Sequence, residues 1–359
     1  QKPVRARVAV VRTSPATVQE DYARALELSG CADVLRAAPD VVAYGNLTWS
    51  RYIPGASSPP WQLEGLAALA NGSGRRWQFV AGTGHTSQPR RGARDARWPG
   101  ALGRHGQRFE PLGRTQILPY PRGRRLLMLQ RVLPTGLPVP RALAGTAAVH
   151  LPTLKTHGLV GLAGAMENAW SAWMPAGGGA AAAHPHEVLV DLLLLQRETH
   201  SAVCAVMDGT IVGDGAGPRT VEPREANVLL ASTDPVALDA TAARLAGLDP
   251  FGLRYLALAY ALGLGCADTD AIEVVGDEMG PGELQLRARR PPAALARTVL
   301  EELRLSRLED WLFRRRWLAP ASAVYYDLVW LNVVGRARLA AFRRTDWGKL
   351  FMSYPSQTT

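Results

Sequence analysis

The fold of this sequence is decided by the stretch Leu151-Pro-Thr-Leu-Lys155-Thr-His157-Gly-Leu-Val-Gly-Leu-Ala-Gly164-Ala-Met-Glu-Asn168, where an apolar strand ends in a glycine-rich loop. Lys155 and His157 are two residues apart, so on an extended segment their side chains point to the same side. A lysine supplies positive charge, and a histidine can move a proton or bind a metal. Small residues such as Gly164 let a ligand or another backbone come close. We therefore predict that Lys155 and His157 are catalytic and that Gly164 and Asn168 bind the ligand.

A structural role is the alternative for both catalytic candidates. His157 would then cap the following helix or bond a carbonyl, and Lys155 would form a surface ion pair. Glu167, which precedes Asn168, is a candidate partner for Lys155.

Outward from this stretch, β-branched runs alternate with segments that have helical apolar spacing. This alternation predicts an α/β fold with a mostly parallel sheet and helices on both faces. Strands are expected at 5–12, 40–47, 76–81, 146–151, 202–207, 227–231 and 271–275, with helices at 17–29, 60–70, 186–200, 235–245 and 251–264.

Two regions depart from this alternation. Residues 88–125 are rich in Arg, Pro and Gly and predict a long surface excursion, with short strands at 116–118 and 126–132. Residues 173–185 are nearly all Gly, Ala and Pro and predict a flexible connection or lid. We therefore expect one main domain over residues 1–290, followed by a basic helical extension over 291–359.

The C-terminal extension is rich in Arg and Trp, and two interpretations stay open. It packs its Trp and Leu side chains on the domain, or it meets a membrane surface as an amphipathic element. No run approaches the roughly 20 apolar residues of a membrane span. The chain is expected to be cytoplasmic or peripheral to a membrane, and because it begins at Gln1, any segment removed before it cannot be judged.

The chain is basic, with 41 Lys and Arg against 31 Asp and Glu and a net charge of +10. This excess fits an anionic partner, although solvated surface arginines explain it equally well. Nucleic acid is an unlikely partner, because the sequence lacks ribonucleoprotein, zinc-finger and basic-zipper motifs. The three cysteines are far apart, without a Cys-x-x-Cys pair, which argues against a zinc or iron–sulfur motif.

Further candidates follow other predicted strands, where ligands of α/β proteins bind. Asn46 follows the second strand, and a glycine-rich loop with Gly82 and His85 follows the third. These three are predicted to bind the ligand, although a lone histidine such as His85 is more often structural.

Three aspartates complete the predicted site. Asp208 and Asp214 flank a glycine-rich loop after the strand 202–207, and could act as a general base or, with His157, hold a divalent metal. An ordinary Asp-Gly turn is the alternative. Asp234 precedes Pro235 in the pattern of a helix N-cap, and a role in ligand binding is the second interpretation.

Taken together, these motifs resemble the family called domain of unknown function 362. The resemblance covers about residues 5–280 and rests on Leu151–Asn168, on Met207-Asp208-Gly with Gly213-Asp214-Gly-Ala-Gly-Pro218, on Ala231-Ser-Thr-Asp234-Pro-Val-Ala-Leu-Asp239-Ala and on Gly247-Leu-Asp-Pro250. Many relatives carry ferredoxin-like cysteine clusters, which this chain lacks, so no intrinsic iron–sulfur cluster is expected. Glu167 stands where the family usually has Lys.

We expect an enzyme that acts on a small anionic or carbonyl-bearing substrate at the strand ends. Because many members of the family carry iron–sulfur segments, the resemblance slightly favours an oxidoreductase that takes electrons from an external donor protein. One alternative is a racemase or epimerase in which Lys155 and His157 shuttle a proton. Another is a non-catalytic protein that binds an anionic ligand or a membrane surface.

Overall fold

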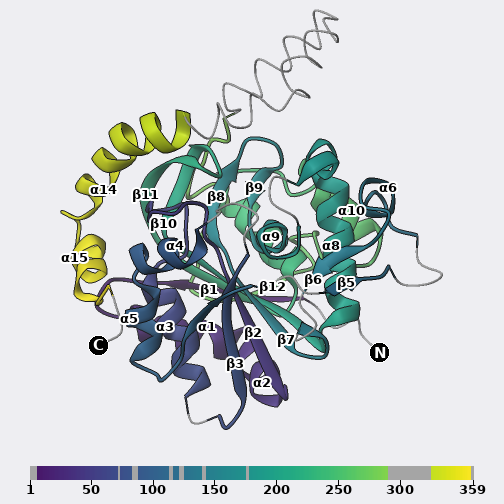
Figure 1. Cartoon of the computed structure of the whole chain (residues 1–359), viewed down its shortest axis with the longest axis horizontal. Helices are drawn as coiled ribbons and strands as arrows, with labels where there is room; N and C mark the ends of the chain where they lie inside the picture. The colour runs from purple at the N-terminus through teal and green to yellow at the C-terminus, as the bar shows by residue number, and fades with distance from the viewer. Residues whose placement is uncertain are drawn as a thin grey trace, which may run out of the picture.

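The protein is seen in a computed structural model that describes residues 6–71, 73–82, 88–112, 116–120, 125–139, 143–174, 178–289 and 325–356. Within them, ten strands form one sheet, whose main order is β12-β1-β11-β10-β7-β2-β3-β4 (Figure 1). The strands are β1 (Arg7–Arg12), β2 (Asp40–Gly45), β3 (Arg76–Ala81), β4 (Phe109–Pro111), β7 (Ala147–Leu151), β8 (Thr153–His157), β9 (Gly161–Ala163), β10 (Ala202–Ala216), β11 (Thr220–Ser232) and β12 (Glu273–Gly276).

Most neighbouring strands of this sheet are parallel. The exceptions are β11, which is antiparallel to β1 and β10, and β9, which is antiparallel to β8. A separate antiparallel pair is formed by β5 (Gln116–Leu118) and β6 (Leu137–Val139). The predicted α/β fold with a mostly parallel sheet is confirmed.

Helices cover both faces of the sheet, as predicted (Figure 1). Pro60 begins α3 at the position where its fixed φ and missing N–H suit a helix. One face carries α1 (Val18–Leu28), α2 (Cys31–Ala37), α3 (Pro60–Ala70), α4 (Pro89–Asp95) and α5 (Trp98–Gly103). The other carries α6 (Leu129–Val132), α7 (Ala165–Trp173), α8 (Pro185–Thr199), α9 (Pro235–Ala246) and α10 (Arg254–Ala261), with the short helix η2 (Gly179–Ala183) beside α8.

Residues 88–112 add buried side chains to the core as well as exposed arginines, so they are more than a surface excursion. Trp98 and Leu102 of α5 are fully buried, and the Trp98 indole donates a hydrogen bond to the Ser58 carbonyl over 2.9 Å. Small apolar residues between the arginines pack inward, while the arginines point outward. Further along, the strand predicted at 126–132 is wrong, because α6 occupies its end.

The glycine-rich stretch 208–218 is also not the loop that was predicted. Residues 208–216 continue β10, which pairs with β11 in a long antiparallel hairpin, and Gly217 and Pro218 lie in its turn. In the connection predicted as flexible, the described residues from 178 onward form η2 and the start of α8.

The described C-terminal residues form η4 (Tyr325–Gly335), α14 (Arg336–Phe342) and α15 (Asp346–Ser353). The Trp347 ring lies 4.9 Å from that of Trp61, and Phe351 stacks on Tyr52 at 4.4 Å. This part of the extension packs on the domain, which is one of the two interpretations above. None of the described helices is long and apolar enough to cross a bilayer.

Candidate functional site

The central motif forms β7 and β8, which are one strand interrupted at Pro152. Residues Lys155 and His157 both lie in extended β8, which pairs with β10 on one side and with β9 on the other. Both residues thus lie in one strand, two positions apart, which is the arrangement that the predicted common direction requires.

Lys155 is buried, with only 1% of the residue exposed. Its Nζ donates to the Ala56 carbonyl at 3.0 Å and lies 3.5 Å from that of Thr153. Burial lowers the pKa of Lys155 to about 8, and the negative charge of Glu167 opposes this shift. A buried amine with this pKa exchanges a proton near neutral pH, which a surface lysine does not.

Glycines make the enclosure of Lys155 possible. A Cβ on Gly213 would lie 2.9 Å from the Lys155 Cβ and 2.6 Å from the Gly55 carbonyl oxygen. The missing side chain therefore lets β10, β8 and the segment 46–60 come together around the amine.

His157 organises the turn that follows β8. Its Nδ1 accepts the N–H of Leu159 at 3.1 Å and of Val160 at 3.4 Å, and the side chain is partly exposed. Because Nδ1 is an acceptor, the neutral ring carries its proton on Nε2. His157 thus has a structural role in this turn, although it neither caps the following helix nor bonds a carbonyl through these contacts, which were the structural alternatives considered.

Two buried acidic side chains, Glu167 of α7 and Asp239 of α9, lie at the first turn of α7. The buried Asp239 carboxylate accepts the N–H of Ala165 at 2.6 Å and of Met166 at 3.1 Å, so that it caps this helix from α9. Burial raises the pKa of Asp239 to about 7. Glu167 is also buried, and its charge, with that of Asp239, raises the pKa of Tyr255 further after the larger effect of burial.

The Tyr255 hydroxyl is a feature that sequence reasoning missed. It is fully buried and has no hydrogen-bond partner among the described residues. The charges of Asp239 and Glu167 both act on it. The sequence did not indicate this feature, because the apolar helical pattern around Tyr255 predicts only an ordinary core residue.

Asn168 links the central motif to a second buried network. Its Nδ2 donates to the Tyr44 carbonyl at 2.8 Å and contacts Nδ1 of His150 at 3.2 Å, while its Oδ1 has no partner in the part of the chain described. His150 Nε2 in turn contacts Gln196 Oε1. Burial lowers the pKa of His150 to about 4.

This second network was also missed, although one signal was present. His150 interrupts an otherwise apolar strand, and a polar residue at such a position needs buried partners. Its partner Gln196 and the neighbouring His200 come from α8 and its C-cap. The Tyr44 ring stacks on that of His150 at 5.0 Å, and its hydroxyl contacts Nε2 of His200 at 3.2 Å.

Asn46 and Gly82 lie where predicted, at the carboxyl ends of β2 and β3, but both are closely packed by the protein itself. The Asn46 carbonyl and Oδ1 accept bonds from Ser58 N at 2.9 Å and Thr48 Oγ1 at 3.1 Å. A Cβ on Gly82 would lie 1.6 Å from the Ser171 carbonyl oxygen. His85 lies outside the described residues.

Asp208 lies within β10 and points toward α1 and α3, so its predicted place at a strand end is wrong. Its carboxylate accepts bonds from Tyr22 Oη at 2.6 Å, Trp61 Nε1 at 3.0 Å, and Thr210 N and Oγ1 at 3.1 and 2.7 Å. Burial raises the pKa of Asp208, and these hydrogen bonds oppose the shift.

The predicted metal group of His157, Asp208 and Asp214 does not form. Asp208 is enclosed by its four donors, and Asp214 accepts from Arg224 Nη1 at 3.1 Å and from Arg287 N at 2.7 Å. No three His, Cys, Asp or Glu side chains of the described residues come together as metal ligands.

Asp234 is the N-cap of α9, as one of its two interpretations predicted. It accepts the N–H groups of Val236 and Ala237, and also that of Cys266 at 2.9 Å. Its predicted place beside Lys155 is wrong: β11 runs antiparallel to its neighbours and ends opposite the start of β1. Asp234 therefore lies at the other edge of the sheet.

The residues that the structure brings to the carboxyl edge are thus Lys155, His157, Glu167, Asn168 and Asn46. Comparison with known proteins shows that the chain belongs to the family described as Domain of unknown function (DUF362), whose model matches residues 45–244. All five residues lie within the matched range.

The chain is also similar to a thylakoid-associated protein of Synechocystis sp. (strain ATCC 27184 / PCC 6803 / Kazusa). The two are 31% identical over 133 residues, which are 34% of this chain and 39% of that protein. The match thus covers about two fifths of the length of this curated relative. No solved structure matches the chain.

Proposed function

We propose that this protein is an enzyme that binds a small anionic or carbonyl-bearing molecule at the carboxyl edge of the sheet and moves a proton there through Lys155. The observation that supports this most directly is the buried Lys155 amine, whose pKa is lowered to about 8. A general base works best when its pKa lies near the working pH. At pH 7 about one amine in ten is then neutral and able to accept a proton.

The neighbouring groups suit a carbonyl or carboxylate ligand. A substrate oxygen that replaced the Ala56 carbonyl would accept a bond from Lys155 Nζ. The unpartnered Oδ1 of Asn168 is an acceptor for a hydroxyl or amino group of the same molecule. Glu167, the carboxylate in place of the family's usual lysine, favours the protonated form of Lys155 after proton uptake.

Proton transfer next to a carbonyl, the chemistry of racemases and epimerases, is favoured here over redox chemistry with an external donor protein. Amine, carboxylate and imidazole side chains exchange protons readily, and these are the groups of this edge. The external donor protein was expected only because many family members carry iron–sulfur segments, and no residue of this edge favours it.

Solvent exchange tests this proposal and does not require the product to be identified. The protein would be incubated in D₂O with a panel of small 2-hydroxy, 2-oxo and amino acids. Loss of the C–H signal at C2 of the hydroxy and amino acids, and at C3 of the 2-oxo acids, would be followed by NMR. We expect exchange with at least one acid, and at least a hundredfold slower exchange for Lys155→Met, because a positioned general base contributes about 10²–10⁴-fold.

Lys349→Met is the matched control, since this lysine is exposed on α15 and pairs with Asp346. It should exchange like the wild type. Binding of an acid without exchange would support the non-catalytic anionic-ligand protein instead. Exchange that survives in Lys155→Met would contradict the role given to Lys155.

A further inference from the structure

Two parts of the chain that are distant in sequence border the same short segment, residues 47–53. On one side lies α4: a Cβ on Gly92 would come within 2.8 Å of the Trp49 carbonyl oxygen, and the Tyr52 N–H donates to Asp95 over 2.6 Å. On the other side lie the C-terminal helices, because Trp330 of η4 stacks on Trp49 with ring centres 5.6 Å apart. α4 and the C-terminal helices are therefore neighbours on one surface.

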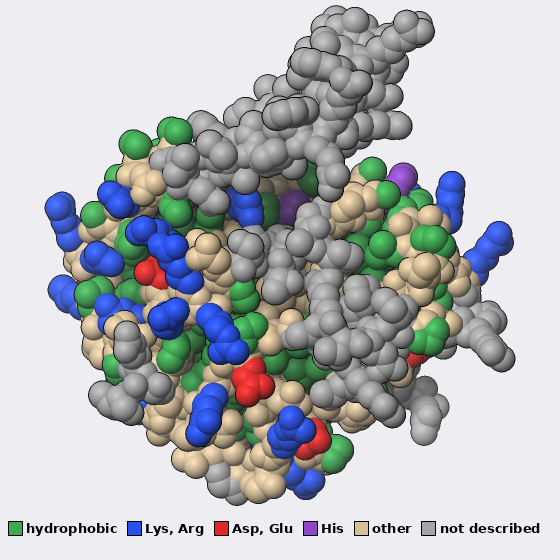
Figure 2. All heavy atoms as spheres, viewed as in Figure 1, with side chains coloured by type: hydrophobic (Ala, Val, Ile, Leu, Met, Phe, Trp, Pro, Cys, Tyr) green, Lys and Arg blue, Asp and Glu red, His purple; other side chains and the backbone are tan. Residues whose placement is uncertain are grey.

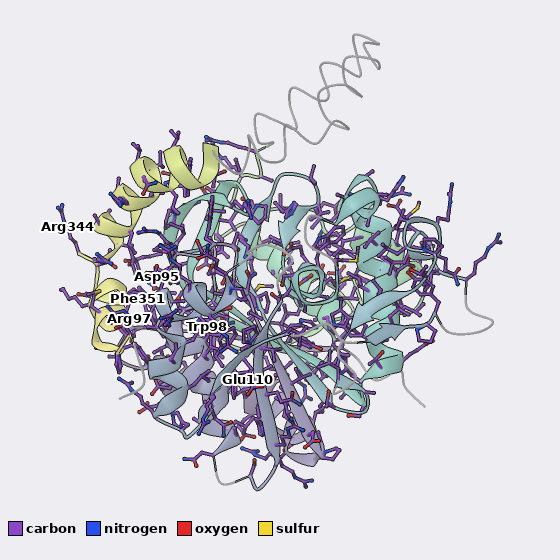
Figure 3. The ribbon with its side chains drawn as sticks, viewed as in Figure 1. Asp95, Arg97, Trp98, Glu110, Arg344 and Phe351 are labelled. Atoms are coloured by element: carbon purple, nitrogen blue, oxygen red, sulfur yellow. The ribbon has the colours of Figure 1, made fainter. Side chains whose placement is uncertain are left out.

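This surface is basic. Arg90, Arg91 and Arg94 are exposed on α4, and Arg343 and Arg344 are exposed at the turn between α14 and α15. The two groups lie on neighbouring elements, because the charge of Arg343 adds to burial in lowering the pKa of Arg97, which lies two residues after the end of α4. Figure 2 shows blue side chains gathered on this side of the molecule, and Figure 3 shows Arg97 and Arg344 on it.

The acidic side chains near these arginines, such as Asp95 and Asp346, do not pair with them in the described part of the chain. Within the part of the chain that the structure describes, Arg90, Arg94, Arg343 and Arg344 form no ion pair. The acidic neighbour Asp95, labelled beside Arg97 in Figure 3, is bonded to the Tyr52 N–H. Such a cluster attracts a polyanion or an anionic surface.

Exposed apolar side chains lie on the same C-terminal helical segment that precedes Arg343 and Arg344. Val329 and Val333 of η4 are 51% and 66% exposed, while Trp330 and Leu331 between them are buried. Residues four apart share one face of a helix, so the two valines form an apolar strip that faces solvent. Val329 directly precedes Trp330, which contacts the segment 47–53, so the strip borders the same surface.

We propose that this basic surface, formed by Arg90, Arg91, Arg94, Arg343 and Arg344 with Val329 and Val333, binds an anionic lipid bilayer. The arginines contact phosphate groups, and the valines enter the boundary between headgroups and acyl chains. A strip of exposed valines favours lipid over nucleic acid, because single-strand binding relies on aromatic stacking. The similarity to a thylakoid-associated protein agrees with this partner.

Vesicle co-sedimentation of the full chain tests the proposal. Vesicles of phosphatidylcholine containing phosphatidylglycerol should bind the protein, and vesicles of phosphatidylcholine alone should bind it at least tenfold more weakly. Each arginine near an anionic surface is worth about fivefold in affinity. Arg343→Gln with Arg344→Gln should therefore weaken binding by about tenfold or more, and salt at about 1 M should abolish most of it.

The matched control is Arg75→Gln with Arg76→Gln, which removes two exposed arginines from the start of β3, at the amino edge of the sheet. It should leave binding within about twofold of the wild type. Val329→Asp with Val333→Asp should weaken binding, whereas Leu262→Asp, at an exposed leucine beside α10, should not. Thermal melts of each variant establish that it is folded.

Three outcomes would overturn the proposal. They are equal binding to neutral and anionic vesicles, equal losses in the β3 control and the Arg343/Arg344 variant, and tighter binding to a single-stranded oligonucleotide than to anionic vesicles. The last outcome would assign the surface to nucleic acid. None of them bears on proton exchange at Lys155, so this proposal and the enzymatic one fail separately.

Discussion

The carboxylate of Asp239 occupies the space that a side chain at Gly164 would need. A Cβ on Gly164 would lie 2.1 Å from Asp239 Oδ1, the same oxygen that accepts the N–H of Ala165. Gly164 must therefore lack a side chain for Asp239 to cap α7. The small residue is required by a protein side chain at this position, whereas the sequence pattern had suggested room for a ligand.

Gly164→Ala is expected to destabilise the protein by about 2–4 kcal/mol, because a buried cap must move or be lost. Urea unfolding measures the change. Gly280→Ala is the control, since a Cβ there meets no atom within 4 Å, and it should cost less than about 0.5 kcal/mol. An equal effect of both substitutions would argue against the cap.

Asp208→Asn should destabilise the protein by about 3 kcal/mol or more. The carboxylate accepts from four donors, and an amide would turn an N–H toward one of them inside the core. Asp33→Asn removes an aspartate that is 84% exposed and should cost under about 1 kcal/mol. Chemical denaturation of both variants checks this, and a mild Asp208→Asn variant would refute the structural role.

His150 and His200 should each contribute a loss of stability as the pH drops below about 6.5, while the raised pKa of Asp239 acts in the opposite direction. Burial lowers the pKa of His150 to about 4 and that of His200 to about 3, whereas in the unfolded chain both lie near 6.5. Between these values the unfolded state binds more protons, so lowering the pH favours unfolding. At pH 5 each histidine costs about 2 kcal/mol relative to pH 7. Unfolding curves at both pH values measure this, and His150→Gln should reduce the difference while His184→Gln, at an exposed position, should not.

Lys155 should contribute a rise in stability between pH 8 and pH 10. The folded chain loses the Lys155 proton at about pH 8, whereas the unfolded chain keeps it to about 10.5. Over this window the unfolded state binds more protons, so raising the pH favours the folded state. Lys155→Met removes the titrating group and should flatten this rise, while Lys349→Met should preserve it. A rise that persists in Lys155→Met would have another origin.

Trp347→Ala is expected to cost about 3–5 kcal/mol, because the ring is buried against Trp61. Its Nε1 also donates to Asn227 Oδ1 at 2.7 Å. Met352→Ala, one turn further in α15 and 45% exposed, should cost under about 1 kcal/mol. Guanidinium unfolding distinguishes the two, and an unchanged midpoint for Trp347→Ala would show that α15 does not complete the core.

Local patterns predicted much of the fold. The β-branched run of β1, the Pro60 entry of α3 and the Asp234-Pro235 start of α9 are each decided by residues within one turn or strand. Strand direction was not predictable in this way. β11 has the apolar pattern of a parallel strand, and only its pairing with β10 through the hairpin makes it antiparallel. That one reversal moved Asp234 away from the other predicted site residues.

The site was predicted in part for a similar reason. The common direction of Lys155 and His157 follows from spacing along one strand. The burial of Lys155 does not, because it depends on Gly55 and Gly213, which are distant in sequence. Asp208 was misplaced because glycines after it suggested a loop, whereas they let the strand pass close to other backbone segments.

The docking of α15 has a consequence for biosynthesis. Trp61 bonds to Asp208 and packs on Trp347, and Glu64, on the same helix, accepts a bond from the Tyr354 hydroxyl. Helix α3 is synthesised early, but Trp347 and Tyr354, which pack on it, are synthesised almost 300 residues later. Contacts of such long sequence separation form slowly. Until Tyr354 has been synthesised, the apolar surface that α15 covers stays exposed on the nascent chain, and exposed apolar surface of this kind promotes aggregation.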